Sequence, residues 1–347
     1  MKFTIFLTRD CNLDCKYCYE GDKSSDYMSI ETADKVINFI DGRVKNIPYL
    51  KKNKINIVLY GGEPLLNHKV LDYIVNKLDI KNEYNANFDM TTNGTIMNST
   101  ILNTLKKIDS VSVSIDGGVD IHNKNRIFKS NKGTFNVVKE TIEKMISEGI
   151  SIRARGTYNP QTCKYLYDSV DAISNLGVDC IVMHPDMSDE NWNEQDFDII
   201  FNQIKKMIND ENLNKKCKHI SLIDDYKFSC EVGSCFGGIA DFAIDCNGDV
   251  YPCSRAVGFK EFLIGNVYNN NLNNEKINQL VKLNIDNDVC KGCSRINYCE
   301  GNRCKIINKM DTGDFFKPNG IICKFEEIEL NKYKYIKGLK NKNDLFK

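Results

Sequence analysis

Residues 11–19 read Cys-Asn-Leu-Asp-Cys-Lys-Tyr-Cys-Tyr and come shortly after an apolar run at residues 3–7. Cys11, Cys15 and Cys18 thus lie on one loop behind an expected strand. Iron–sulfur clusters are usually held by four cysteine thiolates, and structural zinc sites are also closed by four protein ligands. Three cysteines on one loop therefore indicate a metal centre with an open position. The alternative is a zinc knuckle whose fourth ligand comes from elsewhere.

The composition is that of a globular protein without net charge. Of 347 residues, 41% are hydrophobic, and 47 Lys and Arg balance 47 Asp and Glu. A neutral chain offers no general attraction for nucleic acid or an anionic membrane, and residues 3–7 are too few for a signal peptide or a membrane span. We therefore expect a cytoplasmic protein, in which 15 cysteines indicate metal binding and not a disulfide framework.

Apolar runs of strand length alternate with helical periodicity up to about residue 210, which predicts βα units and a parallel sheet. Ser29 is the expected N-cap of the first helix, which we expect to end before Gly42. The sequence thus predicts an α/β fold with a partial (β/α)6 TIM-like barrel, followed by a smaller cysteine-rich domain. Its six strands are expected at residues 3–7, 55–60, 87–92, 110–115, 150–158 and 179–184.

Polar motifs follow the first four expected strands. In βα barrels the reactive groups lie at the carboxyl ends of the strands, so these motifs should share one rim. Gly61 and Gly62 allow a sharp turn and a close approach to a ligand, and Glu63 adds a carboxylate that can hold an ammonium group. Each motif also fits an ordinary turn. The motifs are the cysteine loop, residues 61–64 (Gly-Gly-Glu-Pro), residues 91–94 (Thr-Thr-Asn-Gly) and residues 114–117 (Ser-Ile-Asp-Gly).

A second set of cysteines occupies the C-terminal third of the chain. Residues 242–251 among them have the pattern of a β-hairpin with its turn at Asn247-Gly248. A zinc ribbon is one interpretation of this set. The set consists of Cys230, Cys235, Cys246, Cys253, Cys290, Cys293, Cys299, Cys304 and Cys323. The scattered Cys163, Cys180 and Cys217 are expected to act as small buried hydrophobes.

Together these motifs resemble the radical SAM enzymes, which use S-adenosylmethionine, and the later cysteines resemble the SPASM extension of members that modify peptides and proteins. The resemblance implies three 4Fe-4S clusters. Cys11, Cys15 and Cys18 would hold the first, whose fourth iron binds the amine and carboxylate of S-adenosylmethionine. The auxiliary clusters would take Cys290, Cys293, Cys299 and Cys323, and Cys235, Cys253 and Cys304. Either Cys230, which we favour, Cys246 or a substrate thiolate would complete the last. Four residues separate Cys299 from Cys304, where the family more often has three.

The same resemblance implies roles for other rim residues. Gly61, Gly62 and Glu63 match the segment that holds the methionine amine. An arginine of the fifth strand would reach the cofactor's carboxylate, and because Arg153 and Arg155 share one face of a strand, both remain candidates. Asp116 would be the base that takes a substrate proton, while Arg126 either contacts substrate or lies on the surface. The remaining residues expected near the cofactor are Tyr17, Asn93 and Ser114.

We expect four segments: a partial barrel (residues 1–210), a bridge (211–228), a SPASM domain (229–325) and a helical tail (326–347). The resemblance implies a peptide maturase that generates a 5′-deoxyadenosyl radical, abstracts hydrogen from a ribosomally made peptide and forms a thioether or other crosslink. The alternatives are an anaerobic sulfatase-maturing enzyme that makes formylglycine and, as a non-enzyme, an iron–sulfur electron carrier or metal-binding scaffold.

The implied partners are a peptide or protein substrate and a reductant such as flavodoxin or ferredoxin. A separate leader-peptide-binding protein is also expected, because the chain starts at its first strand. Neither nucleic acid nor a membrane is expected as a partner.

Overall fold

The computed structural model describes residues 1–18, 20, 23–45, 55–78, 86–225, 231, 233–269 and 271–344, and side chains as far as residue 339. The chain forms two compact units. Unit 1 comprises residues 1–115, 122–154 and 236–281, and unit 2 comprises residues 116–121, 155–235 and 282–347. Within the described ranges, no helix is both long and apolar enough to cross a bilayer.

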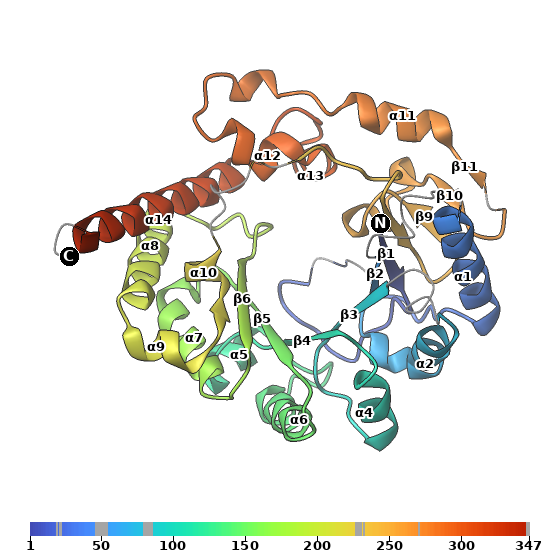
Figure 1. Cartoon of the computed structure of the whole chain (residues 1–347), viewed down its shortest axis with the longest axis horizontal. Helices are drawn as coiled ribbons and strands as arrows, with labels where there is room; N and C mark the ends of the chain where they lie inside the picture. Colours follow the sequence, from blue (N-terminus) through green and yellow to red (C-terminus); the bar gives the residue numbers. More distant parts are fainter. Residues whose placement is uncertain are drawn as a thin grey trace. The chain divides into compact units, whose positions relative to one another are not determined.

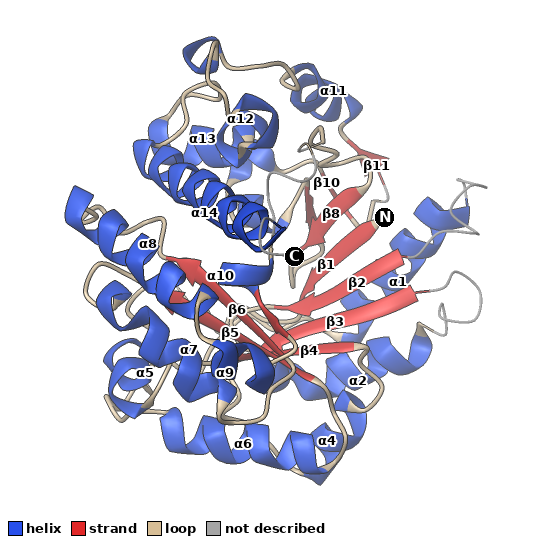
Figure 2. Ribbon diagram, turned by 60° about the vertical axis from the view of Figure 1, so that its left-hand side comes forward, coloured by secondary structure: helices blue, strands red, loops and turns tan. Residues whose placement is uncertain are grey.

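Unit 1 is built on a parallel sheet. Strands β1 (Lys2–Phe6), β2 (Ile55–Tyr60), β3 (Ala86–Thr92) and β4 (Ser110–Ser114) pair in this order, and all four run in the same direction. Their carboxyl ends therefore meet at one edge, where the sequence predicted the rim. Figure 2 shows these strands side by side.

The predicted hairpin is confirmed, and it extends this sheet. Strand β8 (Asp241–Ile244) pairs parallel with β1, and β9 (Asp249–Tyr251) returns antiparallel to β8. Gly248 in the turn has φ +90°, a conformation that glycine adopts without strain. The short strands β10 (Gly265–Asn266) and β11 (Asn271–Leu272) continue the antiparallel part.

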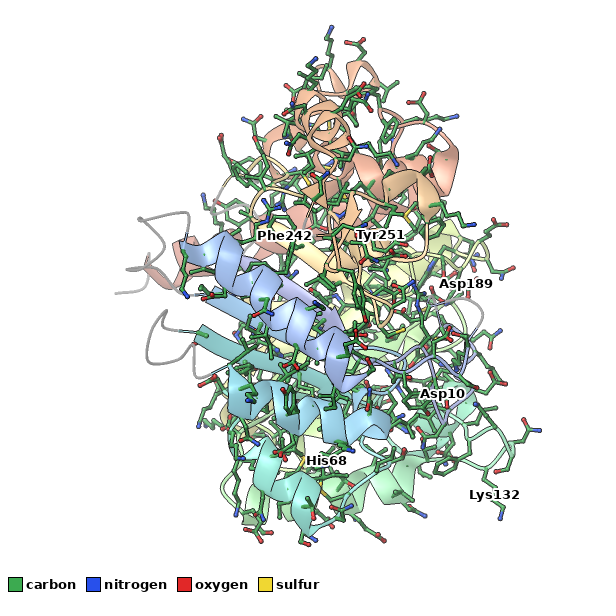
Figure 3. All side chains as sticks on the ribbon, turned by 90° about the vertical axis from the view of Figure 1, so that its right-hand side faces the viewer. Asp10, His68, Lys132, Asp189, Phe242 and Tyr251 are labelled. Atoms are coloured by element: carbon green, nitrogen blue, oxygen red, sulfur yellow. The ribbon has the colours of Figure 1, made fainter. Side chains whose placement is uncertain are left out.

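Three aromatic rings explain why β8 joins β1 so far along the chain. Phe3 of β1 stacks on Phe242 of β8 with ring centroids 5.5 Å apart, and Phe39 of a covering helix packs edge-on against both. All three side chains are buried. Figure 3 marks Phe242 and Tyr251 in this part of unit 1.

The helices of unit 1 bury one apolar side each. In the first of them, Ser29 accepts a hydrogen bond from the Thr32 amide, as predicted for its N-cap. This helix continues through Gly42, so its expected end there was wrong; Gly42 lacks the positive φ typical of a terminating glycine. Figure 1 shows α1, α2 and α4 along the strands. The helices are α1 (Ile30–Lys45), α2 (His68–Lys77), α4 (Ser99–Leu105), α6 (Phe135–Ser147) and most of α11 (Asn274–Lys282), with turns η2 (Pro64–Asn67), η5 (Ser254–Ala256) and η6 (Lys260–Phe262).

Two elements cross the boundary between the units along the chain. Helix α5 (Val119–Asn125) and strand β5 (Ile152–Tyr158) each begin in one unit and end in the other. In unit 2, β6 (Cys180–Pro185) pairs parallel with β7 (His219–Ile220). Strand β7 lies in the segment expected to be a bridge and was not predicted. The strand order β11-β10-β9-β8-β1-β2-β3-β4-β5-β6-β7 is that of an open sheet, as a partial barrel requires.

Helices dominate the rest of unit 2. Its core contains an aromatic cluster in which Trp192, Phe197 and Tyr158 pack against Phe325 of the last helix. That helix crosses residue 325, where we expected a domain boundary. The elements are η3 (Cys163–Tyr165), α7 (Leu166–Ser174), α8 (Glu194–Ile208), α9 (Glu211–Lys216), α10 (Ser221–Asp224), η7 (Asp288–Cys290), η8 (Ile296–Tyr298), α12 (Glu300–Arg303), α13 (Lys305–Thr312) and α14 (Gly320–Asp344).

Candidate metal and cofactor site

The cysteine loop connects β1 to α1 and is held by backbone hydrogen bonds. The Asp14 amide donates to the Ile127 carbonyl at 2.8 Å, and the Lys16 amide donates to the Asn125 carbonyl at 3.0 Å. Leu13, in the middle of the loop, is fully buried. The segment that follows α5 therefore acts as a support for the loop.

The three loop cysteines differ in their exposure. Cys11 is buried, Cys15 is half-buried and Cys18 is exposed, and the Cys18 amide donates to the Cys15 carbonyl. Burial raises the pKa of the Cys11 thiol, whereas the Leu13 amide and the Asn93 side chain, which donate to its sulfur at 3.4 and 3.8 Å, lower it. Because the thiolate is the form that binds metal, these two donors favour ligation by Cys11.

The Gly-Gly-Glu segment is joined to the cysteine loop through the backbone. The Gly62 amide donates to the Thr8 carbonyl at 3.0 Å, and the Glu63 amide donates to the Asp10 carbonyl at 2.9 Å. A Cβ on Gly61 would lie 2.5 Å from the Thr8 oxygen, and one on Gly62 would lie 2.3 Å from the Asp10 oxygen. The two glycines thus allow contact between two loops, in addition to the ligand approach predicted from the sequence.

Glu63 lies inside the protein and accepts three hydrogen bonds. Its carboxylate accepts from the Leu65 amide at 3.0 Å, the Thr92 hydroxyl at 2.8 Å and the Asn93 amide at 2.6 Å. Burial raises the pKa of Glu63 to about 7, against the lowering effect of these bonds. The side chain therefore joins the end of β2 to the end of β3.

Asn93 connects the end of β3 to the cysteine loop. Its amide nitrogen donates to Asn12 Oδ1 at 2.9 Å as well as to Cys11 Sγ, and its side-chain oxygen accepts from Thr95. Asn12 in turn donates to the Thr95 hydroxyl at 2.8 Å. The sequence reasoning missed Asn12 and Thr95. Their only signal was that each stands next to a motif already singled out.

Charged and aromatic side chains surround the loop in unit 1. The Arg126 guanidinium lies 5.3 Å from the centre of the Tyr17 ring, which is cation–π distance. Asp10 accepts a hydrogen bond from Tyr27 at 2.7 Å and lies 3.2 Å from the Lys129 ammonium. Figure 3 marks Asp10 at the same end of unit 1 as Lys132. The rim thus carries both signs of charge.

A partly buried ion pair holds the chain just before the cysteines. Nε and Nη2 of Arg9 lie 3.0 and 2.7 Å from the two oxygens of Asp245, at the end of β8. Nothing in the sequence indicated this pair, because 236 residues separate its members. The bidentate geometry fixes the cysteine loop to the hairpin.

The two candidate arginines lie on the same face of β5, as predicted. Residues 153, 155 and 157 are half-buried, while 152, 154, 156 and 158 are buried. Nε of Arg153 donates to the Ser112 hydroxyl of β4 at 2.8 Å. Ser114 ends β4 and is buried.

Asp116 is almost completely buried in unit 2. Its Oδ1 accepts a hydrogen bond from the Thr157 amide of β5 at 2.9 Å. The next residue, Gly117, has φ +152°, and a Cβ there would lie 2.5 Å from the Ser169 hydroxyl. The motif is therefore a tight turn whose carboxylate contacts the backbone of β5.

Electrostatic interactions link several cysteines of unit 2. The pKa of Cys323 is raised by burial and then by Cys290 and Cys293, and that of Cys299 by burial, Glu326 and Cys323. Cys323 therefore interacts electrostatically with Cys290, Cys293 and Cys299. Cys304 is coupled in the same way to Cys235.

The predicted set has three further members, at positions 230, 246 and 253. Cys253 follows β9 in unit 1, and Cys230 lies outside the described residues. Cys246 is buried beside Asp245, and burial together with that carboxylate raises the pKa of its thiol to about 12. Cys163 and Cys217 are also buried, while Cys180 is half-buried.

The donor chemistry at both places fits iron–sulfur ligation. None of the described cysteines forms a disulfide. Among the described residues, no three His, Cys, Asp or Glu side chains are arranged tightly enough to hold a single metal ion. Cysteine thiolates are nevertheless the residue type that holds iron–sulfur clusters.

Comparisons with known proteins agree with these two cysteine regions. The sequence model of the radical SAM superfamily matches residues 5–160, and the model of the SPASM iron–sulfur cluster-binding domain matches residues 235–294. Such domains imply S-adenosylmethionine and iron–sulfur clusters as cofactors.

Two relatives and one solved structure extend the comparison. The cysteine-type anaerobic sulfatase-maturating enzyme of Clostridium novyi (strain NT) is 22% identical over 319 residues, which are 84% of each chain. The subtilosin biosynthesis protein AlbA of Bacillus subtilis (strain 168) is 23% identical over 287 residues, 76% of this chain and 57% of AlbA. A structure of anSMEcpe with bound AdoMet and Kp18Cys peptide has a TM-score of 0.78 at 19% identity and covers 99% of both chains, which shows the shared fold.

Proposed function

The chain belongs to the radical SAM superfamily and carries a SPASM domain, and we propose that it is a maturase that crosslinks a ribosomally made, cysteine-containing peptide. The supporting observation is the joining of three motifs at one edge of the sheet. The cysteine loop, Gly61-Gly62-Glu63 and Asn93 share backbone and side-chain hydrogen bonds where β1, β2 and β3 end. An electron carrier or metal scaffold has no need of the last two motifs.

The cluster ligands follow from the cysteine groups. Cys11, Cys15 and Cys18 would hold the cluster that binds S-adenosylmethionine, and the two auxiliary clusters would use the C-terminal cysteines, with Cys230 completing the set of Cys235, Cys253 and Cys304. When bound, the first cluster supplies the electron that cleaves S-adenosylmethionine to methionine and a 5′-deoxyadenosyl radical. The chain's own residues bind and orient the cofactor and exclude water.

We assign the cofactor's carboxylate to Arg155. Nε of Arg153 already donates to Ser112, two residues before the end of β4, whereas Arg155 lies two residues nearer the carboxyl end of β5. Arg155→Lys should then raise the KM for S-adenosylmethionine more than Arg153→Lys does. The reverse order would move the assignment to Arg153.

Other rim residues take the roles expected from the family. The Gly-Gly-Glu loop would receive the methionine amine, and Asn93, Ser114 and Tyr17 would border the rest of the cofactor. Asp116 is the proposed base for a substrate proton, since a buried carboxylate at a strand end can accept one. Asp116→Asn should then reduce peptide modification while the cleavage of S-adenosylmethionine continues.

A second function is favoured by a specific observation. The match to the sulfatase-maturating enzyme covers 84% of both chains, whereas only 57% of AlbA is covered. Oxidation of a sulfatase cysteine to formylglycine would use the same hydrogen abstraction. Both reactions need a reductant such as flavodoxin or ferredoxin, and the peptide reaction would also use a separate leader-binding protein.

Two experiments test these functions: the first measures cleavage of S-adenosylmethionine, and the second identifies the modified peptide. The protein is reconstituted with iron and sulfide under anaerobic conditions, and 5′-deoxyadenosine is measured after adding dithionite and S-adenosylmethionine, with Cys15→Ala as the control. Candidate peptides encoded beside the gene are then analysed by mass spectrometry. Loss of two hydrogen atoms supports a crosslink, whereas exchange of the thiol for an aldehyde supports formylglycine. No 5′-deoxyadenosine above the control would rule out both functions.

A further inference from the structure

A lysine side chain lies buried among the C-terminal cysteines. Lys305, the first residue of α13, is only 5% exposed, and it directly follows Cys304. Among the described residues, no Asp or Glu forms an ion pair with it; its ammonium donates to the Asn302 carbonyl at 2.7 Å and to Asn287 Oδ1. A buried cation needs a compensating negative charge nearby.

The candidate counter-charges are two thiolates and the carboxylate of Asp286. Burial lowers the pKa of Lys305, while Cys290, Asp286 and Cys304 raise it. Cys290 and Cys304 belong to the two different cysteine groups of the SPASM domain. An iron–sulfur cluster held by four thiolates has a net negative charge, so clusters at these groups would provide the missing compensation.

Asn287 connects the ammonium to one of the sulfurs. This side chain is completely buried, accepts from Lys305 at Oδ1, and donates from Nδ2 to Cys290 Sγ at 3.8 Å and to the Gly301 carbonyl at 3.1 Å. A donor polarised by a cation at its far end is a stronger donor. The Asn287 side chain thus links the Lys305 ammonium to the Cys290 sulfur.

A buried carboxylate lies near the opposite members of the same group. Glu326 of α14 is 3% exposed and raises the pKa of both Cys299 and Cys323, and one of its oxygens accepts from the Glu300 amide. The group of Cys290, Cys293, Cys299 and Cys323 therefore has a cation near one member and an anion near two others.

We infer that Lys305, acting partly through Asn287, is a positioning residue that raises the reduction potential of the auxiliary cluster held by Cys290. This inference rests on the proposed clusters. Reduction adds one negative charge to a cluster, so a nearby cation and a hydrogen bond to a ligand sulfur favour the reduced state. A cluster tuned in this way accepts an electron more readily, as is needed when a substrate radical is oxidised to product.

The test measures potentials in a chain that keeps only the auxiliary clusters. Cys11, Cys15 and Cys18 are replaced by Ala in the full-length protein, iron and sulfide are counted after anaerobic reconstitution, and midpoint potentials are obtained by redox titration followed by EPR. Lys305→Met and Asn287→Asp are compared with Lys309→Met. Lys309 lies one turn further along α13 and donates to the Gly313 carbonyl, away from Asn287.

We expect Asn287→Asp and Lys305→Met to shift the same midpoint to lower potential, and Glu326→Gln to shift it to higher potential. Lys309→Met should leave both midpoints unchanged. The inference would be overturned if Asn287→Asp or Lys305→Met kept its full cluster content and its midpoint potentials did not change. It would also be overturned if either substitution shifted the midpoint to higher potential. If Lys305→Met cannot hold the cluster, Asn287→Asp alone decides. Absence of any cluster in the parent chain would instead contradict the proposed function.

Discussion

The two cysteine regions of this molecule are held in opposite ways. The loop of residues 11–18 has a fully buried apolar residue, Leu13, and hydrogen bonds to residues 93 and 95 after β3 and to residues 125 and 127. Between residues 283 and 300, by contrast, only Asn287 and Cys299 are buried, and Ile285 and Val289 are 62% and 71% exposed. The conformation of residues 11–18 is therefore fixed by contacts with the rest of unit 1, whereas residues 283–300 have no hydrophobic core of their own.

This difference suggests two uses of metal. In the first region, hydrogen bonds to the rest of unit 1 fix the backbone of the loop that carries Cys11, Cys15 and Cys18. In the second, several cysteines stand in a segment with almost no buried apolar side chains. Metal binding supplies folding free energy where a core is missing. We therefore expect auxiliary clusters to be part of the fold of unit 2.

The largest effect is expected from a substitution that unfolds the second cysteine region and leaves the first one folded. Cys299→Ser should expose residues 283–319 to protease, because the buried thiol joins η8 to α12 and its cluster replaces a core there. Cys15→Ser should abolish the cleavage of S-adenosylmethionine and leave the protease pattern of the parent. Limited proteolysis under anaerobic conditions, with fragments identified by mass spectrometry, makes the comparison. Equal digestion of both variants would contradict it.

Glu63 offers a pH-dependent test of the first region. Its folded pKa is about 7, above the ordinary value of 4.5. The folded state therefore binds the proton more tightly, so the stability from this group is complete below pH 4.5 and is lost as the pH rises through about 7. Ionisation of the buried group should cost on the order of 3 kcal/mol.

The measurement compares the parent with Glu63→Gln by chemical denaturation from pH 5 to pH 8. At pH 5 the variant should be less stable by about 1–3 kcal/mol, because its amide cannot accept from the Asn93 amide while Oε1 serves Leu65 and Thr92. The deficit should shrink as the pH rises. A difference that is independent of pH would exclude titration of Glu63 in this range.

Two glycines provide a matched pair. Gly62→Ala places a Cβ 2.3 Å from the Asp10 carbonyl, so the two loops must separate, at a cost of about 2 kcal/mol. In Gly42→Ala, the added Cβ has no atom within 4 Å. Because Gly42 lies inside α1 and alanine has the higher helix propensity, this substitution should stabilise the protein by about 0.5–1 kcal/mol. Denaturation midpoints test both. A harmless Gly62→Ala would show that the contact between the loops is not needed.

The smallest effect concerns Arg126 and Tyr17. Their cation–π contact should contribute about 0.5–1 kcal/mol at this partly buried site. A double-mutant cycle with Arg126→Met and Tyr17→Leu isolates the coupling from the individual losses. Additive effects of the two substitutions would mean that the support after α5 holds the cysteine loop through its backbone alone.

Local patterns were sufficient for most of the sheet. The strand expected at residues 55–60 has those bounds, and the other predicted strands differ by one or two residues at their ends. Periodicity could not reveal the pairing of β8 with β1, because that depends on Phe3, Phe39 and Phe242 meeting across long stretches of chain. Strand β7 was missed because two residues carry no period.

The candidate site was predictable in its residue types and less so in its contacts. The spacing of Cys11, Cys15 and Cys18 indicated candidate ligands on one loop, and turn chemistry located Gly61 and Gly62 beside that loop. Neither could indicate that Glu63 accepts from β3, or that Arg9 forms an ion pair with Asp245. Such contacts join positions far apart in sequence, and a single chain carries no local signal of them.

The most direct test of the proposed cofactor site with an open iron is EPR spectroscopy of the anaerobically reduced protein before and after S-adenosylmethionine is added. We predict an iron–sulfur signal that changes on addition in the parent, and a signal from the auxiliary clusters alone, without change, in Cys15→Ala. Zinc in place of iron, or a parent spectrum that S-adenosylmethionine leaves unaltered, would contradict the assignment of the cysteine loop.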